Sequence, residues 1–141
     1  MWRREVSAVY SNVAIDDVWN AWVDVSNWHQ WDTAIEYCDI RQQFAVGNKF
    51  ILKPQHGPKV KVKIKTVEPN KVFISYCNFL GARMYHEHYL EQVDHGVKIT
   101  QVVRLTGPLT FLWKSIVAEK LVNQIPQQTK NLVDYLSSAY V

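Results

Sequence analysis

The sequence contains little cysteine and no long hydrophobic run. Its 2 cysteines, Cys38 and Cys77, are too few for the disulfide framework that staples small secreted proteins. No apolar stretch approaches the roughly 18 residues that a membrane-spanning helix needs. The opening residues Met-Trp-Arg-Arg-Glu lack the apolar segment of a signal peptide. These absences predict a cytoplasmic protein without integral membrane association.

The chain also lacks a strong charge of either sign. Its 16 Lys and Arg against 13 Asp and Glu give a formal net charge of +3, and the basic residues are spread along the chain. Nucleic-acid-binding domains usually concentrate their basic residues in a patch, so we expect no nucleic-acid partner. A length of 141 residues predicts a single domain over residues 1–141 with one substantial core.

What the sequence does contain is one long amphipathic segment at its C-terminal end. Apolar residues recur there at spacings of three, four and seven, which is the period of one helix face. They are Trp113, Val117, Leu121, Ile125, Leu132, Leu136 and Ala139. Gln124 and Gln128 lie beside this stripe, so the buried face is not purely apolar. The pattern predicts a helix over 109–141, after Gly107-Pro108. We expect a kink or break at Pro126, which lacks a backbone N–H.

The chain before this helix is predicted to be mostly strands. Alternation over 6–10 indicates a first strand, and a helical period from Ala14 places Trp19 and Trp22 on one face. A second, very short helix is expected over 28–31. Turn signals then separate six strand-like runs. The turns are Val46-Gly47-Asn48, His56-Gly57-Pro58, Pro69-Asn70, Gly81-Ala82 and His95-Gly96. The fold class is therefore α+β, ordered as strand, two helices, six strands and long helix.

The predicted hairpin turns determine which residues face each other across the sheet. A two-residue turn at Gly81-Ala82 places Cys77 opposite His86, and one at His95-Gly96 places His86 opposite Leu105. The registers agree on one mostly apolar face, which we expect to pack on the long helix. This face comprises Val60, Val62, Ile64, Phe73, Ser75, Cys77, Phe79, Met84, His86, His88, Leu90, Ile99, Gln101, Val103 and Leu105. The opposite face carries a row of lysines, Lys59, Lys61, Lys63 and Lys65.

Polar side chains interrupt the predicted apolar face. They are Ser75, Cys77, His86, His88 and Gln101. Burying an unpaired polar group costs about 1–3 kcal/mol, so these groups indicate a cavity that is wet or ligand-filled. Partners within a packed core are the alternative. Cys77 with the two histidines could also hold zinc or form a Cys–His nucleophile, but the predicted face offers no acidic residue to complete either site. We predict neither metal nor cofactor.

Tryptophan is concentrated in the region of the two short helices, with Trp19, Trp22, Trp28 and Trp31 close together in sequence. Aromatic residues at helical spacing usually belong to a core. Two short helices joined by a loop also suit a lid over one end of a cavity. Trp28 and Trp31 are therefore candidates for the ligand entrance, with core packing as the alternative.

Several local strings match a known pattern. They are Ala14-Ile15-Asp16-Asp17-Val18-Trp19, Asp24, Trp28, Trp31-Asp32, Val46-Gly47, Gly96-Val97 with Thr100, and Thr106-Gly107-Pro108-Leu109. In these strings the chain resembles the START-like, Bet v 1-like superfamily, and within it the polyketide cyclase/dehydrase-like group of small bacterial domains. The resemblance implies a helix-grip fold, a curved seven-stranded antiparallel sheet around the C-terminal helix with a hydrophobic cavity between them. Members bind lipids, sterols, hormones or polyketides, and some are cyclases, dehydratases or hydrolases, typically without a metal. No motif transfers a catalytic residue.

The leading hypothesis is a monomeric or homodimeric protein that binds a small hydrophobic molecule, lipid- or polyketide-like, in that cavity. The predicted ligand-binding residues are Trp28, Trp31, Phe50, Leu52, Ile64, Phe73, Ser75, Cys77, Phe79, Met84, His86, His88, Gln101, Val103, Val117 and Leu121. An enzyme hypothesis uses His86 or His88 as general acid/base in a cyclisation or dehydration. A third hypothesis is an interaction module without a ligand, which engages a partner through the lysine row or an exposed aromatic patch.

Overall fold

The computed structural model describes residues 1–138, so Ala139 of the predicted stripe lies outside the described residues. The elements in order are β1 (Trp2–Tyr10), α1 (Ile15–Val23), the 3-10 helix η1 (Val25–Gln30), β2 (Ile35–Asp39), β3 (Lys49–Pro54), β4 (Val60–Glu68), β5 (Val72–Phe79), β6 (Ala82–Val93), β7 (Gly96–Thr106), α2 (Thr110–Trp113), the π-helix η2 (Lys114–Ala118) and α3 (Glu119–Ser138). This is the predicted order of one strand, two short helices, six strands and a C-terminal helical segment.

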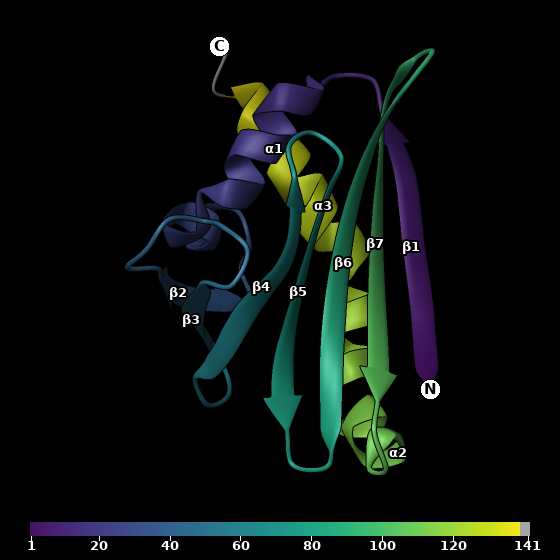
Figure 1. Ribbon diagram of the computed structural model, residues 1–141. Helices are drawn as coiled ribbons and strands as arrows, with labels where there is room; N and C mark the ends of the chain where they lie inside the picture. The colour runs from purple at the N-terminus through teal and green to yellow at the C-terminus, as the bar shows by residue number, and fades with distance from the viewer. Residues whose placement is uncertain (139–141) are drawn as a thin grey trace.

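The seven strands form one antiparallel sheet in the order β1-β7-β6-β5-β4-β3-β2. The C-terminal helix runs behind the sheet, alongside β1, β6 and β7, and α1 lies at the upper end beside the C-terminal part of α3 (Figure 1). The helix η1 packs on β2. The β2–β3 end of the sheet lies on the side away from β1 (Figure 1). None of the described helices is long and apolar enough to cross a membrane.

The C-terminal helical segment is continuous from α2 through η2 to α3, and α3 runs unbroken through Pro126. The expected interruption lies instead at Lys114–Ala118, where the backbone is π-helical and each turn accommodates an extra residue. Pro126 is exposed, and its missing N–H removes one hydrogen bond. Buried residues on both sides, such as Ile125 and Leu132, hold the helix on the sheet.

Two hairpin registers differ from the predicted ones by two residues. Cys77 lies opposite Met84 rather than His86, and His86 lies opposite Val103 rather than Leu105. Each turn begins one residue earlier than expected, so every partner moves by two positions. Because side chains alternate along a strand with a period of two, this shift leaves each side chain on its predicted face.

The predicted inner face is the one that packs on the helices. Phe73, Val103 and Leu105 are fully buried there, whereas the lysine row on the opposite face is exposed. The buried apolar residues form two clusters. One gathers around Phe73 beneath α1 and η1, and the other gathers around Val103 beneath η2 and the first part of α3.

Candidate functional site

The predicted ligand-binding residues divide between these two apolar clusters and a polar row that separates them. Trp28, Trp31, Phe50, Leu52, Ile64 and Phe73 belong to or pack against the first cluster. Cys77, Phe79, Met84, Val103, Val117 and Leu121 belong to or pack against the second. The remaining predicted residues are Ser75, His86, His88 and Gln101. They follow each other across β5, β6 and β7, with Ser75 opposite His86 and His88 opposite Gln101.

His88 is an aromatic member of the core. Its ring stacks on Phe73, with the centroids 3.9 Å apart and an interplanar angle of 11°, and it meets the edge of Trp22 at 5.1 Å. Its Nδ1 is buried and has no hydrogen-bond partner among the described residues. Burial, followed by the neighbouring His86, holds the pKa of His88 well below its usual value. His88 is therefore a neutral ring packed in the core.

A hydrogen-bonded chain runs from His86 on the sheet to Asp32 beside the helix. His86 Nε2 lies 2.7 Å from Gln101 Oε1. Gln101 Nε2 donates to Gln128 Oε1 at 3.3 Å, and Gln128 Nε2 donates to Asp32 Oδ2 at 2.7 Å. Gln101 Nε2 also donates to Thr129 Oγ1 at 3.1 Å. The chain thus connects β6, β7, α3 and the segment between η1 and β2. It supplies polar partners for His86 and Gln101, as the packed-core alternative anticipated.

Asp32 brings to this chain the acidic group that the predicted sheet face lacked. Only 6% of the residue is exposed, and its Oδ1 accepts the backbone N–H of Ala34 at 3.0 Å. Burial raises the pKa of the Asp32 carboxyl, and the hydrogen bonds from Gln128 and Ala34 counteract that rise. Its carboxylate forms no ion pair with any residue of the described part of the chain.

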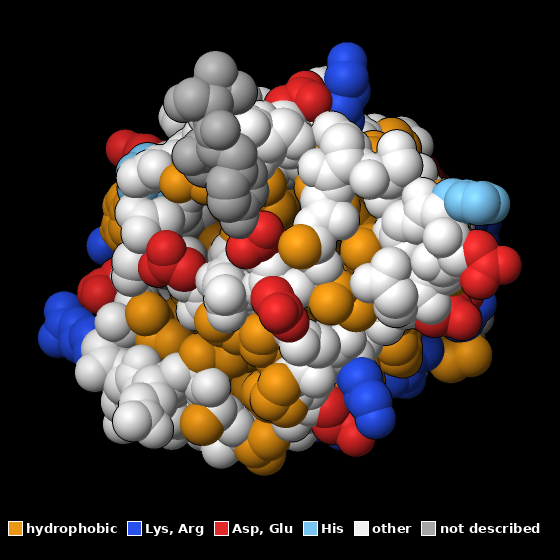
Figure 2. Space-filling model, turned by 90° about the horizontal axis from the view of Figure 1, so that it is seen from above, with side chains coloured by type: hydrophobic (Ala, Val, Ile, Leu, Met, Phe, Trp, Pro, Cys, Tyr) orange, Lys and Arg blue, Asp and Glu red, His pale blue; other side chains and the backbone are white. Residues whose placement is uncertain are grey.

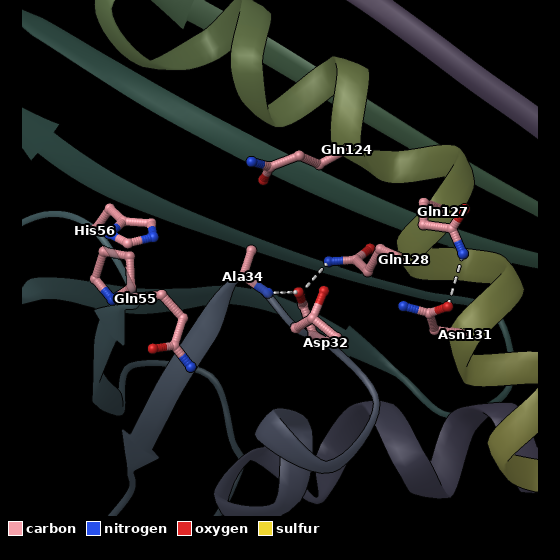
Figure 3. Close-up of a pocket in the computed structure, with 10 residues that line it drawn as sticks. Asp32, Ala34, Gln55, His56, Gln124, Gln127, Gln128 and Asn131 are labelled. Atoms are coloured by element: carbon pink, nitrogen blue, oxygen red, sulfur yellow. Dashed lines mark hydrogen bonds between the residues drawn. The ribbon is translucent and has the colours of Figure 1, made fainter.

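A cleft of about 460 Å³ opens beside Asp32, between α3 and the β2–β3 end of the sheet. Its walls are Asp32, Thr33, Ala34, Pro54, Gln55, His56, Gln124, Gln127, Gln128 and Asn131. Gln55 and His56 lie on the strand side, the four α3 residues lie on the helix side, and Asp32 with Ala34 lies between them (Figure 3). The lining is rich in carboxamides and contains no Lys or Arg.

The cleft has the general position that the fold resemblance implied, between sheet and C-terminal helix, but its lining is polar. None of the predicted ligand-binding residues lines it, because the predicted apolar walls are packed against each other in the two clusters. Sequence reasoning missed Asp32 and Gln128 as site residues. Two signals pointed toward them: Trp31-Asp32 is one of the strings of the resemblance, and Gln128 lies beside the apolar stripe.

The two cysteines are buried free thiols. Burial raises the pKa of Cys38 and that of Cys77 to about 12, so both remain protonated at neutral pH. Cys77, opposite Met84, is therefore unsuited to nucleophilic attack. Within residues 1–138, no group of three or more His, Cys, Asp and Glu residues is placed to hold a metal ion.

No protein-family model and no curated protein matches the sequence. Solved structures do match, over nearly the whole chain. Hypothetical protein jhp0584 from Helicobacter pylori is 15% identical with a TM-score of 0.77, covering 95% of this chain and 87% of that one. Ara h 8.0201 is 17% identical with a TM-score of 0.75, covering 97% and 98%. The di-domain ARO/CYC StfQ from the steffimycin biosynthetic pathway is 7% identical with a TM-score of 0.79, covering 98% and 51%. At such identities the likeness shows the fold alone.

Proposed function

We propose, starting from the helix-grip fold that this chain shares with the START-like, Bet v 1-like superfamily, that the protein binds a small, mostly hydrophobic molecule carrying a polar group. The binding site is the cleft between α3 and the β2–β3 end of the sheet. The observation that carries this proposal is the pair formed by Asp32 and Gln128, a buried carboxyl hydrogen-bonded to a carboxamide in the wall of an open cleft.

The size of the cleft and its surroundings support this proposal. A volume of about 460 Å³ lies within the range of small-molecule sites, roughly 300–1,000 Å³. Gln128 joins the cleft to Gln101 and thus to the polar row between the apolar clusters. The two free thiols support our proposal of a reducing, cytoplasmic setting.

Native mass spectrometry of gently purified protein tests the proposal directly. An extra mass of a few hundred daltons that is lost on denaturation is the expected result. A panel of lipids and aromatic polyketides then identifies ligands that raise the melting temperature, because a ligand that binds only the native state stabilises it.

A matched pair of variants locates the site. Gln127→Trp places a large side chain in the cleft wall, whereas Lys130→Trp places the same side chain on an exposed part of α3 outside it. We expect the first to abolish ligand-induced stabilisation and the second to retain it. A purified protein free of any ligand, with no stabilisation by the whole panel, would argue against the binding function.

An enzymatic function has weaker support in the geometry. His86 and His88 do not line the cleft, and burial lowers the pKa of His86 to about 4, so it is neutral near pH 7. A cyclase or dehydratase that used either ring would need a substrate reaching beyond Gln128. His86→Ala and His88→Ala variants that retain their fold and full turnover on an accepted substrate would exclude the histidine mechanism.

The interaction-module alternative is supported by an exposed apolar patch around the start of the C-terminal helix. Leu80, Phe111, Leu112 and Ile116 are 41–81% exposed there. On the described surface seen from above, Lys and Arg side chains stand apart from each other around the rim (Figure 2). Light scattering of wild-type protein and Phe111→Ser decides whether the patch joins two copies. A dimer in the wild type and a monomer in Phe111→Ser is the result this alternative requires.

A further inference from the structure

We infer that the cleft selects ligands that carry a protonated amine, with Asp32 as the counter-ion. This inference rests on the proposed binding function, and it specifies the ligand's polar group. It starts from the charge of the cleft. Asp32 is the carboxylate in the wall, and no Lys or Arg lines the cleft. His56 lies on the opposite, strand side of the cleft (Figure 3). The nearby Lys53 is held by Glu36 at 3.2 Å and by the Pro54 carbonyl at 2.6 Å.

The direction of the hydrogen-bonded chain identifies Asp32 as an acceptor. Gln101 uses its Nε2 to donate to Gln128 and Thr129, so its Oε1 accepts the Nε2–H of His86. Gln128 in turn donates to Asp32. Along the path from His86 through Gln101 and Gln128, each donor therefore points toward the carboxylate. A chain of this polarity ends most favourably on a negatively charged acceptor, because hydrogen bonds to ionised groups are the stronger ones.

A ligand in the cleft can supply the positive charge that no Lys or Arg of the cleft wall supplies to Asp32. Each Asp32 oxygen already accepts one hydrogen bond, from Ala34 or from Gln128, and an ionised carboxylate has about four acceptor positions. A buried carboxylate without a cation is unfavourable. An ammonium group in the cleft would pair with it. The side-chain oxygens of Gln124 and Gln127 lie on the same side of the cleft as further acceptors (Figure 3). Asn131 Oδ1 already accepts the Gln127 Nε2–H at 2.8 Å and keeps one further acceptor position.

A metal ion is a poorer match for this wall. Calcium and magnesium sites are built from several oxygen ligands that usually include more than one carboxylate. Within residues 1–138, no group of three or more His, Cys, Asp and Glu side chains is placed to hold a metal ion, and the cleft wall contains a single carboxylate, Asp32. An organic ammonium ion needs one counter-ion and a few acceptors, which is what the cleft offers. The apolar part of such a ligand would lie toward Ala34 and Pro54.

Two probes that differ only in the polar group test the inference. Tryptamine and tryptophol share an indole ring and a two-carbon chain and end in an ammonium and a hydroxyl group, respectively. Calorimetric titration should show tryptamine binding to the wild type about tenfold more tightly than tryptophol. Asp32→Asn should reduce this preference to nearly none. Asp134→Asn removes the same charge from an exposed position on α3 and should leave the preference unchanged.

A measurement on the wild type keeps the inference testable if Asp32→Asn does not fold. The carboxyl carbon-13 resonance of Asp32 should shift with saturable dependence on tryptamine, and that of Asp134 should not. Equal binding of the two probes, or an unchanged preference in folded Asp32→Asn, would overturn the amine inference and leave the binding function standing. If neither probe binds the wild type at millimolar concentration, the binding function fails for aromatic ligands, and the amine inference fails with it.

Discussion

His86 donates its Nε2–H to Gln101 Oε1 across 2.7 Å, and this bond fixes the tautomer of a half-buried imidazole. The Gln101 amide nitrogen donates to Gln128 and Thr129. If the amide turned over to present its nitrogen to His86, both of these bonds would be lost. The neutral ring therefore has one favoured state, and protonation on Nδ1 must take place in a desolvated environment.

Acidification is expected to destabilise the protein through this ring. Burial lowers the pKa of His86 from 6.5 to about 4, so the unfolded chain binds the proton first. The stabilisation is fully present above the unfolded pKa of 6.5 and is lost as pH falls toward 4. The shift corresponds to about 3 kcal/mol. Denaturant titrations at pH 7 and pH 4 should show that His86→Gln loses roughly that much less stability on acidification than the wild type.

The exposed His29 provides the matched control. His29→Gln should leave the difference between pH 7 and pH 4 as in the wild type. If His86→Gln shows the same acid sensitivity as His29→Gln, then His86 is not the group whose protonation destabilises the fold.

Gln128→Leu is expected to disrupt the hydrogen-bonded chain, whereas Gln127→Leu on the next position of α3 is not. The first substitution leaves Asp32 Oδ2 without its donor, and lost partners of buried groups cost about 1–3 kcal/mol. It should also raise the pKa of Asp32 further, because the bond from Gln128 is one of the two that counteract burial. Urea unfolding and a carbon-13 titration of Asp32 measure the two effects. An equal response of the two leucine variants would show that the hydrogen-bonded chain from His86 to Asp32 does not stabilise the protein.

Phe73→Ala should be among the most destabilising substitutions in the protein. Phe73 is fully buried and contacts the rings of Trp22, Phe44 and His88. Removing such a ring costs about 3–5 kcal/mol through lost burial and the cavity left behind. Phe111→Ala, on the exposed patch, should change the unfolding free energy by less than about 0.5 kcal/mol. Chemical denaturation of both variants checks the contrast.

Gly96→Ala should destabilise the protein far more than Gly47→Ala. Both glycines have positive φ, +152° and +90°, so both alanines meet backbone strain. At Gly96, however, the new Cβ would lie 2.2 Å from the backbone oxygen of Tyr10, whereas nothing lies within 4 Å at Gly47. We expect about 1–2 kcal/mol for Gly47→Ala and a larger loss for Gly96→Ala. Similar melting temperatures for the two variants would contradict the predicted clash at β1.

The sequence was sufficient to predict the element order and the inner face of the sheet, and the matched structures confirm the predicted helix-grip fold. The face was correct even where partners were wrong, because turns that start one residue early move partners by two and keep the period of two. Cys77 illustrates this: it is buried as predicted but lies opposite Met84. Local turn chemistry allows both placements of the turn, and only packing of the whole sheet decides between them.

The candidate site was harder to predict than the fold. Asp32 and Gln128 are 96 positions apart, and no local period relates a residue in a connecting segment to one on the C-terminal helix. The predicted clustering of Ser75, His86, His88 and Gln101 is found, and His86 bonds to Gln101 within it. The further partners of Gln101, which are Gln128 and Thr129, come from α3. Sequence patterns reveal which side chains share a face, whereas the bond between Gln128 and Asp32 depends on how the helix is positioned over the sheet.

The sheet order places the first and the last strands of the chain next to each other. β1 pairs with β7 along its whole length, and the Ser7 and Thr100 hydroxyls meet at 3.0 Å although they are 93 positions apart. During synthesis, β1 therefore cannot pair until β7, the last strand of the sheet, has been synthesised. Closing so long a loop is entropically costly and slow. Folding is accordingly expected to finish with the docking of β1, whose unpaired state exposes the β7 edge to association with other chains.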